Sequence, residues 1–144
     1  MTEITARPAT QEDIINVVSP ELHTFFLSRF DASESITLSF VAEGKVIAVG
    51  GIAGIPFASN GEVWVSLTQE FYRYPMAPLV MRRELRDGEE KLGFYRYQMS
   101  TKRNEPIKTR FAVWMGYPAE AVLHSYSNGE DYVMHARVRR GVKP

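Results

Sequence analysis

The segment ITLSFVAEGKVIAVGG, residues 36–51, has the pattern of two antiparallel strands joined by a tight turn. Its first part alternates apolar and polar side chains, with the two-residue period of a half-buried strand: Ile36, Thr37, Leu38, Ser39 and Phe40. Residues 43–45, Glu-Gly-Lys, supply the turn, and residues 46–49 form the returning strand. This hairpin predicts the centre of a β-sheet.

On the N-terminal side of the hairpin we expect one strand and two helices. Residues 4–7 are typical of a short strand that Pro8 ends. Thr10 and Asp13 have the spacing of a capping box and open the first helix, in which Asp13 can bond back to the cap. Pro20 begins a second helical segment, which ends before Asp31.

On the C-terminal side the pattern predicts four strands and two helices. The strands are expected at residues 62–68, 95–99, 121–126 and 132–138, the last two joined by a Ser-Asn-Gly turn at 127–129. The helices are expected after Pro78 and from Asn104, which can cap the second one. Its apolar face is predicted to be core, as is Trp64; that face consists of Ile107, Phe111, Trp114 and Met115.

The resulting order, β-α-α-β-β-β-α-β-α-β-β, predicts an α/β (α+β) fold. We expect a mixed sheet with helices on both faces, in one domain that spans residues 1–144.

Composition excludes several classes of site. Lys plus Arg and Asp plus Glu number 17 each, so no global field directs the chain to nucleic acid or a membrane, and neither is expected as a partner. The one basic cluster, residues 137–143, is expected to be a solvent-exposed segment. The chain has no cysteine, and its three histidines lack metal-ligand spacing, so no metal site is expected. The sequence shows no signal peptide or membrane-spanning run, which favours a cytoplasmic protein.

Three phrases, in this order and spacing, resemble the GNAT superfamily of N-acetyltransferases. They are ITARPATQEDI at residues 4–14, VAEGKVIAVGG at 41–51 and NEPIKTRFAVWMGY at 104–117. The resemblance implies a GNAT-like, mostly antiparallel sheet and transfer of an acetyl group from acetyl-CoA to an amine. FDASESITLS at 30–39 is also similar to small GNAT-like proteins of short-tailed bacteriophages, which are encoded among internal virion protein genes.

The resemblance also implies roles for individual residues. Glu62 is expected as the general base, and the backbone of Val65, Ser66 and Leu67 is expected to bind the pantetheine amides of acetyl-CoA. Arg73 and Asn104 are expected to contact the same donor. Three alternatives stay open: Glu62 as a strand-end charge, Asn104 as a helix cap, and Arg73 stacked on Tyr72 or Tyr74.

The turn TQEFYRYPMAPLVM, residues 68–81, departs from the superfamily pattern. Its members bind the pyrophosphate on a glycine-rich turn, whereas this one holds no glycine, and Pro75 and Pro78 each remove an N–H donor. The tyrosine that many members place in the late helix as a general acid is Ala112 here, so we name Tyr117 as the acid, with Tyr126 also nearby.

These departures lead to two functional hypotheses. In the first, the chain is an acetyltransferase whose activity is weak or altered. In the second, the activity is lost and the fold serves as a virion-associated or host-interaction module, whose partner is a host or virion protein.

Overall fold

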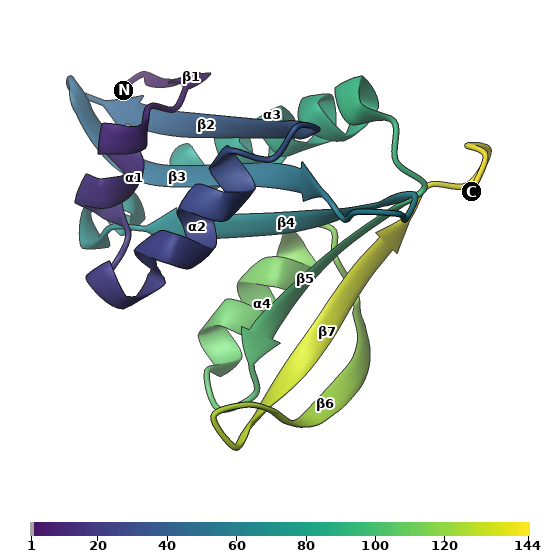
Figure 1. The fold of residues 1–144 in the computed structure, drawn as a ribbon. Coiled ribbons are helices and arrows are strands. Elements are labelled where there is room, and N and C mark those ends of the chain that lie inside the picture. The colour runs from purple at the N-terminus through teal and green to yellow at the C-terminus, as the bar shows by residue number, and fades with distance from the viewer. Residues whose placement is uncertain (1) are drawn as a thin grey trace. The chain divides into compact units, whose positions relative to one another are not determined.

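A computed structural model describes residues 2–144 of the chain. The element order predicted from the sequence is confirmed (Figure 1). The elements are β1 (Ile4–Pro8), α1 (Gln11–Val17), η1 (Pro20–Leu22), α2 (His23–Phe30), β2 (Ser35–Ala42), β3 (Lys45–Gly54), β4 (Asn60–Leu67), η2 (Gln69–Arg73), α3 (Ala77–Leu92), β5 (Arg96–Lys102), α4 (Pro106–Trp114), β6 (Ala119–Ser127) and β7 (Glu130–Val138).

The strands are hydrogen-bonded in the order β1-β2-β3-β4-β5-β7-β6. The pairs β1/β2, β2/β3, β5/β7 and β6/β7 are antiparallel, and β4/β5 is parallel, which confirms a mixed, mostly antiparallel sheet. The contacts divide the chain into two compact units: unit 1 is residues 1–54 and 63–93, and unit 2 is residues 55–62 and 94–144.

The predicted hairpin forms the middle of unit 1. Glu43 and Gly44 both adopt positive φ, at 51° and 77°, which is the geometry of the tight turns that suit the twist of paired strands. A β-bulge interrupts the pairing, because Phe40 lies opposite Ala48 whereas Val41 lies opposite Val46. Ile47 is therefore the extra residue, and Val46 and Val49 face the same side of the sheet.

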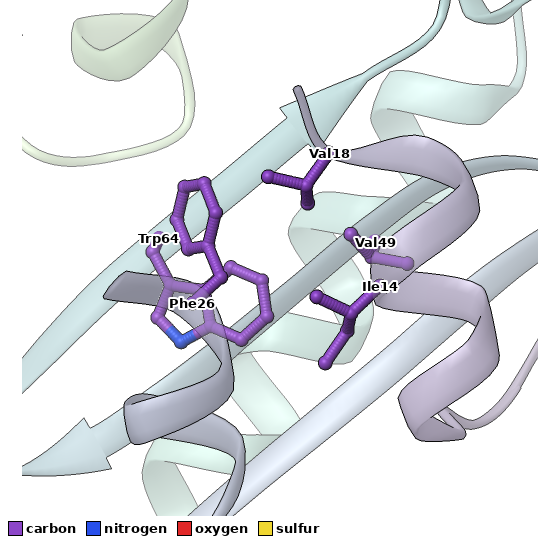
Figure 2. Packing of buried hydrophobic residues seen from close by; sticks show 5 residues of the cluster. All are labelled: Ile14, Val18, Phe26, Val49 and Trp64. Atoms are coloured by element: carbon purple, nitrogen blue, oxygen red, sulfur yellow. The ribbon is translucent and has the colours of Figure 1, made fainter. Parts of the chain in front are cut away.

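Helices cover both faces of the sheet in unit 1, as predicted. On one face α1 and α2 bury a cluster of apolar side chains that includes Trp64, so its predicted place in the core is confirmed (Figure 2). The members of this cluster are Ile14, Val18, Phe26, Val49 and Trp64. On the other face α3 packs close to the sheet, because a Cβ on Gly88 would lie 3.4 Å from Cδ1 of Ile52.

Unit 2 consists of α4 packed on β5 and β7, with β6 paired to the far side of β7. The predicted turn before β7 is confirmed: Asn128 and Gly129 have φ of 52° and 74°. The predicted burial of the α4 face is only partly correct. Met115 is buried and Phe111 is half-buried, but Ile107 and Trp114 are 65 % and 42 % exposed, and within α4 itself the buried residue is Ala112.

In the part of the chain that the structure describes, no helix is both long and apolar enough to cross a membrane.

Candidate functional site

The end of β4 is held tightly against β3 in unit 1. A Cβ on Gly51 would lie 2.6 Å from the carbonyl oxygen of Ile36 and 3.0 Å from the Trp64 ring, so only glycine fits there. A Cβ on Gly50 would lie 3.2 Å from Cγ1 of Val65. These two glycines fix the strand segment that carries the predicted donor-binding residues Val65, Ser66 and Leu67, all of which are half-buried.

A 3-10 helix, η2, follows β4 and was not expected from the sequence. Thr68 anchors it, since both its backbone N–H and its hydroxyl donate to the carbonyl of Ile47, at 3.0 and 2.8 Å. Phe71 is only 1 % exposed and fixes the middle of the segment in the core of unit 1. Arg73, the predicted phosphate contact, ends η2 with its side chain exposed to solvent.

The first turn of α3 offers few backbone donors to an anion. A helix normally presents the N–H groups of its cap and first three residues. Here the Ala77 N–H donates to the carbonyl of Tyr74 at 3.0 Å, and Pro78 has no N–H. The cap residue, Met76, has no side chain that can bond to the turn. The usual anion-binding property of a helix N-terminus is therefore reduced at this turn.

Acidic side chains surround the same turn. The Tyr74 hydroxyl donates to Oε2 of Glu43 at 2.7 Å, and this bond raises the pKa of Tyr74. Lys45 forms an ion pair with Glu70 of η2. These two interactions tie η2 and the start of α3 to the hairpin turn at residues 43–45. They also place two carboxylates beside the turn at which the sequence resemblance led us to expect a phosphate contact.

Glu62, the predicted general base, belongs to unit 2. It lies in the short part of β4 that pairs with β5, opposite Gln98, and its side chain is half-buried. The alternative interpretations of Glu62, base or strand-end charge, both stay predictions.

Asn104 does not cap α4, so that part of the prediction is wrong. The cap residue is Glu105, whose φ of −117° and ψ of 75° lie outside the helical region. The reason is Pro106, because a residue that precedes proline is displaced from the helical region. Asn104 is exposed and lines a shallow hollow of about 370 Å³ with Arg103, Gly129, Glu130 and Asp131.

Tyr117, the predicted general acid, is fully buried in unit 2. Its backbone N–H donates to the carbonyl of Ala112 at 3.0 Å, and its own carbonyl accepts a hydrogen bond from Nδ1 of His135 at 2.9 Å. Ala112, the position where the superfamily often has tyrosine, is also fully buried. Tyr126, the other nearby tyrosine, is 57 % exposed and packs on Tyr132.

His135 begins a buried hydrogen-bond chain that sequence reasoning missed. Because Nδ1 faces a carbonyl, it carries the proton, and Nε2 accepts from the Thr101 hydroxyl at 2.9 Å. Thr101 in turn accepts from Thr109 of α4 at 3.0 Å. Burial lowers the pKa of His135, so the ring is held neutral. The four residues that make this chain lie far apart in sequence, and no local pattern signals it.

The structure thus places the predicted site residues in two groups. Val65, Ser66, Leu67 and Arg73 lie in unit 1, and Glu62, Asn104 and Tyr117 lie in unit 2. Among residues 2–144, no three acidic or histidine side chains gather as a metal site would require.

No family model and no curated protein matches this sequence. Solved structures of acetyltransferases do match its fold. A variant of the spermidine N-acetyltransferase SpeG from Vibrio cholerae has a TM-score of 0.75 at 12 % identity, over 94 % of each chain. A GNAT-family acetyltransferase from Streptococcus pneumoniae has a TM-score of 0.73 at 14 % identity, over 94 % of this chain and 99 % of its own. The IAA acetyltransferase from Bacillus cereus has a TM-score of 0.75 at 11 % identity, over 95 % and 100 %.

At these identities the likeness establishes the fold. The chain has the GNAT fold over nearly its whole length, as the resemblance of its sequence implies.

Proposed function

We propose that the chain transfers an acetyl group from an acetyl-CoA thioester to an amine. The observation that supports this proposal is the likeness in fold to acetyltransferases over 94–95 % of the chain. The acetyltransferases of similar fold include one that is named for spermidine, and we propose an amine as the class of acceptor.

The chemical step is assigned to residues of unit 2. The amine nitrogen attacks the thioester carbonyl, an N–C bond forms and the C–S bond breaks. Glu62 accepts the proton that the amine loses, and Tyr117 supplies a proton to the departing thiolate. Separate Tyr117→Phe and Tyr126→Phe variants test buried Tyr117 against exposed Tyr126 as the acid.

Donor binding is assigned mainly to unit 1. Backbone groups of Val65, Ser66 and Leu67 bond to the pantetheine amides, and the exposed guanidinium of Arg73 binds phosphate. We propose that affinity for acetyl-CoA is weak, because the Ala77 N–H is already bonded, Pro78 has none, and Glu43 and Glu70 lie beside the turn.

Two measurements test this function. Titration calorimetry with acetyl-CoA is expected to show binding at high micromolar concentration, and coenzyme A release is expected with an acceptor panel that includes spermidine, smaller amines and peptides. Glu62→Gln should reduce turnover by about a hundredfold or more without changing donor binding, while exposed Glu90→Gln should not change it. Correctly folded protein that neither binds acetyl-CoA nor releases coenzyme A would contradict the proposal.

A second candidate function rests on the surface of the η2–α3 turn. It exposes Tyr72 and Met76, at 67 % and 38 %, beside Arg73, and tyrosine, methionine and arginine are residue types that interfaces favour. In this alternative the chain is an inactive binding module that contacts a virion or host protein, as its resemblance to the phage proteins implies. Turnover with any amine acceptor would refute it.

A further inference from the structure

The loop between β3 and β4 carries a phenylalanine that projects into solvent. Phe57 is 109 % exposed, more than in an extended reference peptide, and has a φ of 62°, which a bulky residue rarely adopts. The loop is closed beneath it, because the N–H of Ile55 donates to the carbonyl of Asn60 at 2.8 Å and that of Ala58 donates to Ile55 at 3.2 Å. The apolar tip formed by residues 56–58 is therefore fixed outward.

A basic segment lies beside this tip in unit 2. Residues 137–143 contain four cationic side chains and no acidic one, and Arg140 and Lys143 are exposed. Tyr95 connects the two segments: its N–H donates to the carbonyl of Ser59 at 3.0 Å, and its carbonyl accepts from the N–H of Arg139 at 2.8 Å. Figure 1 shows the chain leaving β7 next to the start of β4.

The shape and charge of this surface fit one kind of partner. An apolar side chain on a convex tip enters the boundary between headgroups and acyl chains, and nearby cations are attracted to anionic headgroups. Single-stranded nucleic acid instead favours several aromatic side chains along a basic groove, whereas this tip carries Phe57 alone. We propose that the Phe57 loop and residues 137–143 form a docking site for an anionic phospholipid membrane.

A membrane partner departs from the expectation drawn from net charge, which was that neither a membrane nor nucleic acid is bound. Because cationic and acidic residues number 17 each, the whole chain has no net electrostatic attraction to anions, but a local surface can still be basic. At physiological salt the screening length is about 8 Å, so the charges beside the tip contribute most of the attraction to a membrane surface.

Vesicle sedimentation tests the docking site. The protein should bind vesicles of phosphatidylcholine mixed with an equal part of phosphatidylserine, and should not bind phosphatidylcholine alone. Binding should weaken as salt is raised. Phe57→Asn should lower the partition coefficient roughly tenfold, because it removes the apolar group. Asparagine tolerates positive φ, so the loop should keep its fold. Arg140→Gln and Lys143→Gln should each lower binding about fivefold.

Matched control variants on α4 distinguish binding through this surface from nonspecific binding to vesicles. Ile107 is exposed and apolar, and Arg110 is exposed and basic, yet Ile107→Gln and Arg110→Gln should leave binding unchanged. A second readout uses Phe57→Trp with brominated lipid. Anionic vesicles that contain brominated lipid should quench the tryptophan fluorescence of this variant more strongly than that of the natural protein. The tryptophans of the natural protein are Trp64 and Trp114.

Three outcomes would overturn the proposal. One is equal binding to neutral and anionic vesicles; another is binding that Phe57→Asn and Ile107→Gln reduce equally. The third is an absence of vesicle binding. Binding of a labelled single-stranded oligonucleotide or a glutamate-rich peptide through the same residues would then identify a different partner.

Discussion

The guanidinium of Arg7 donates two hydrogen bonds to the carboxylate of Asp13, at 2.7 and 3.2 Å. The same carboxylate accepts from the Thr10 N–H at 3.0 Å and from the Ser39 hydroxyl at 2.8 Å. Because these partners come from β1, the α1 cap and β2, one side chain joins three elements of unit 1: β1, α1 and β2.

We predict that Asp13→Ala lowers the free energy of unfolding by about 2–4 kcal/mol, because a buried hydroxyl and a guanidinium then lose their shared acceptor. Urea unfolding of the purified variant measures this loss. Glu12→Ala, at an exposed neighbouring position, should change stability by less than about 0.5 kcal/mol. Equal effects of the two substitutions would contradict the role given to Asp13.

Asp13 should also make the protein sensitive to acid. The hydrogen bonds from Arg7 hold the pKa of Asp13 well below its usual range. A carboxyl group with a lowered pKa in the folded state stabilises above its unfolded pKa of about 4 and loses that contribution as pH falls. Stability measured between about pH 5 and pH 2 should therefore fall more steeply in the natural protein than in Asp13→Asn. An equal fall of stability with pH in the natural protein and in Asp13→Asn would show that Asp13 does not cause the acid sensitivity.

Two glycines of unit 1 should respond to alanine in opposite directions. Gly51→Ala should cost about 1–3 kcal/mol, because its Cβ would lie 2.6 Å from the backbone oxygen of Ile36. Gly88→Ala should gain about 0.5–1 kcal/mol, since it lies inside α3 and its Cβ would make ordinary contact with Ile52 at 3.4 Å. Thermal or urea unfolding of both variants checks the signs, and a stabilising Gly51→Ala would show that β2 and β4 adjust freely.

His135 should impose a second pH dependence in a separate range. Burial lowers its pKa, so its contribution to stability is complete above the unfolded value of about 6.5 and is lost as pH falls. Between about pH 7 and pH 5 the natural protein should lose more stability than His135→Gln. His124 is exposed, so His124→Gln should retain the natural pH profile. Loss of that profile in the His124 variant would contradict this assignment.

The turn before α3 should gain affinity for coenzyme A when its donors are restored. Replacing residues 73–78 by a glycine-rich turn adds backbone N–H groups, and each charge-assisted bond to phosphate contributes about 1.5–3 kcal/mol. Two such bonds should change the Kd by at least a hundredfold in calorimetry. Met81 and Leu85, which are buried and unchanged, should preserve the helix. Tight binding by the natural protein that Arg73→Ala abolishes would show instead that the turn is a modified site.

The features predicted correctly from the sequence depend on neighbouring residues. The capping box needs only Thr10 and Asp13, and the structure shows both of its hydrogen bonds, at 3.1 and 3.0 Å. The hairpin turn needs only Glu43 and Gly44. Strand alternation and helix periodicity then gave the order of the elements, which the backbone geometry confirms.

The features that were missed depend on distant contacts. The 3-10 helix η2 needs the carbonyl of Ile47 as an anchor, and the chain from His135 to Thr109 needs three elements to meet. The exposure of Ile107 and Trp114 follows from how α4 is rotated on its strands, which an apolar stripe alone does not fix. Roles for Glu62 and Tyr117 came from resemblance, and they stay predictions that the proposed measurements test.

The interleaving of the two units has a consequence for the order in which the chain is made. All of unit 1 has been synthesised once residue 93 is joined, before most of unit 2 exists. Residues 60–62, however, pair with β5, so this short part of β4 has no strand partner on that side until residues 96–98 leave the ribosome. Unit 1 can therefore fold first, while the start of β4 still lacks its partner strand. The last third of the chain then completes unit 2 by pairing with this earlier-synthesised part of β4.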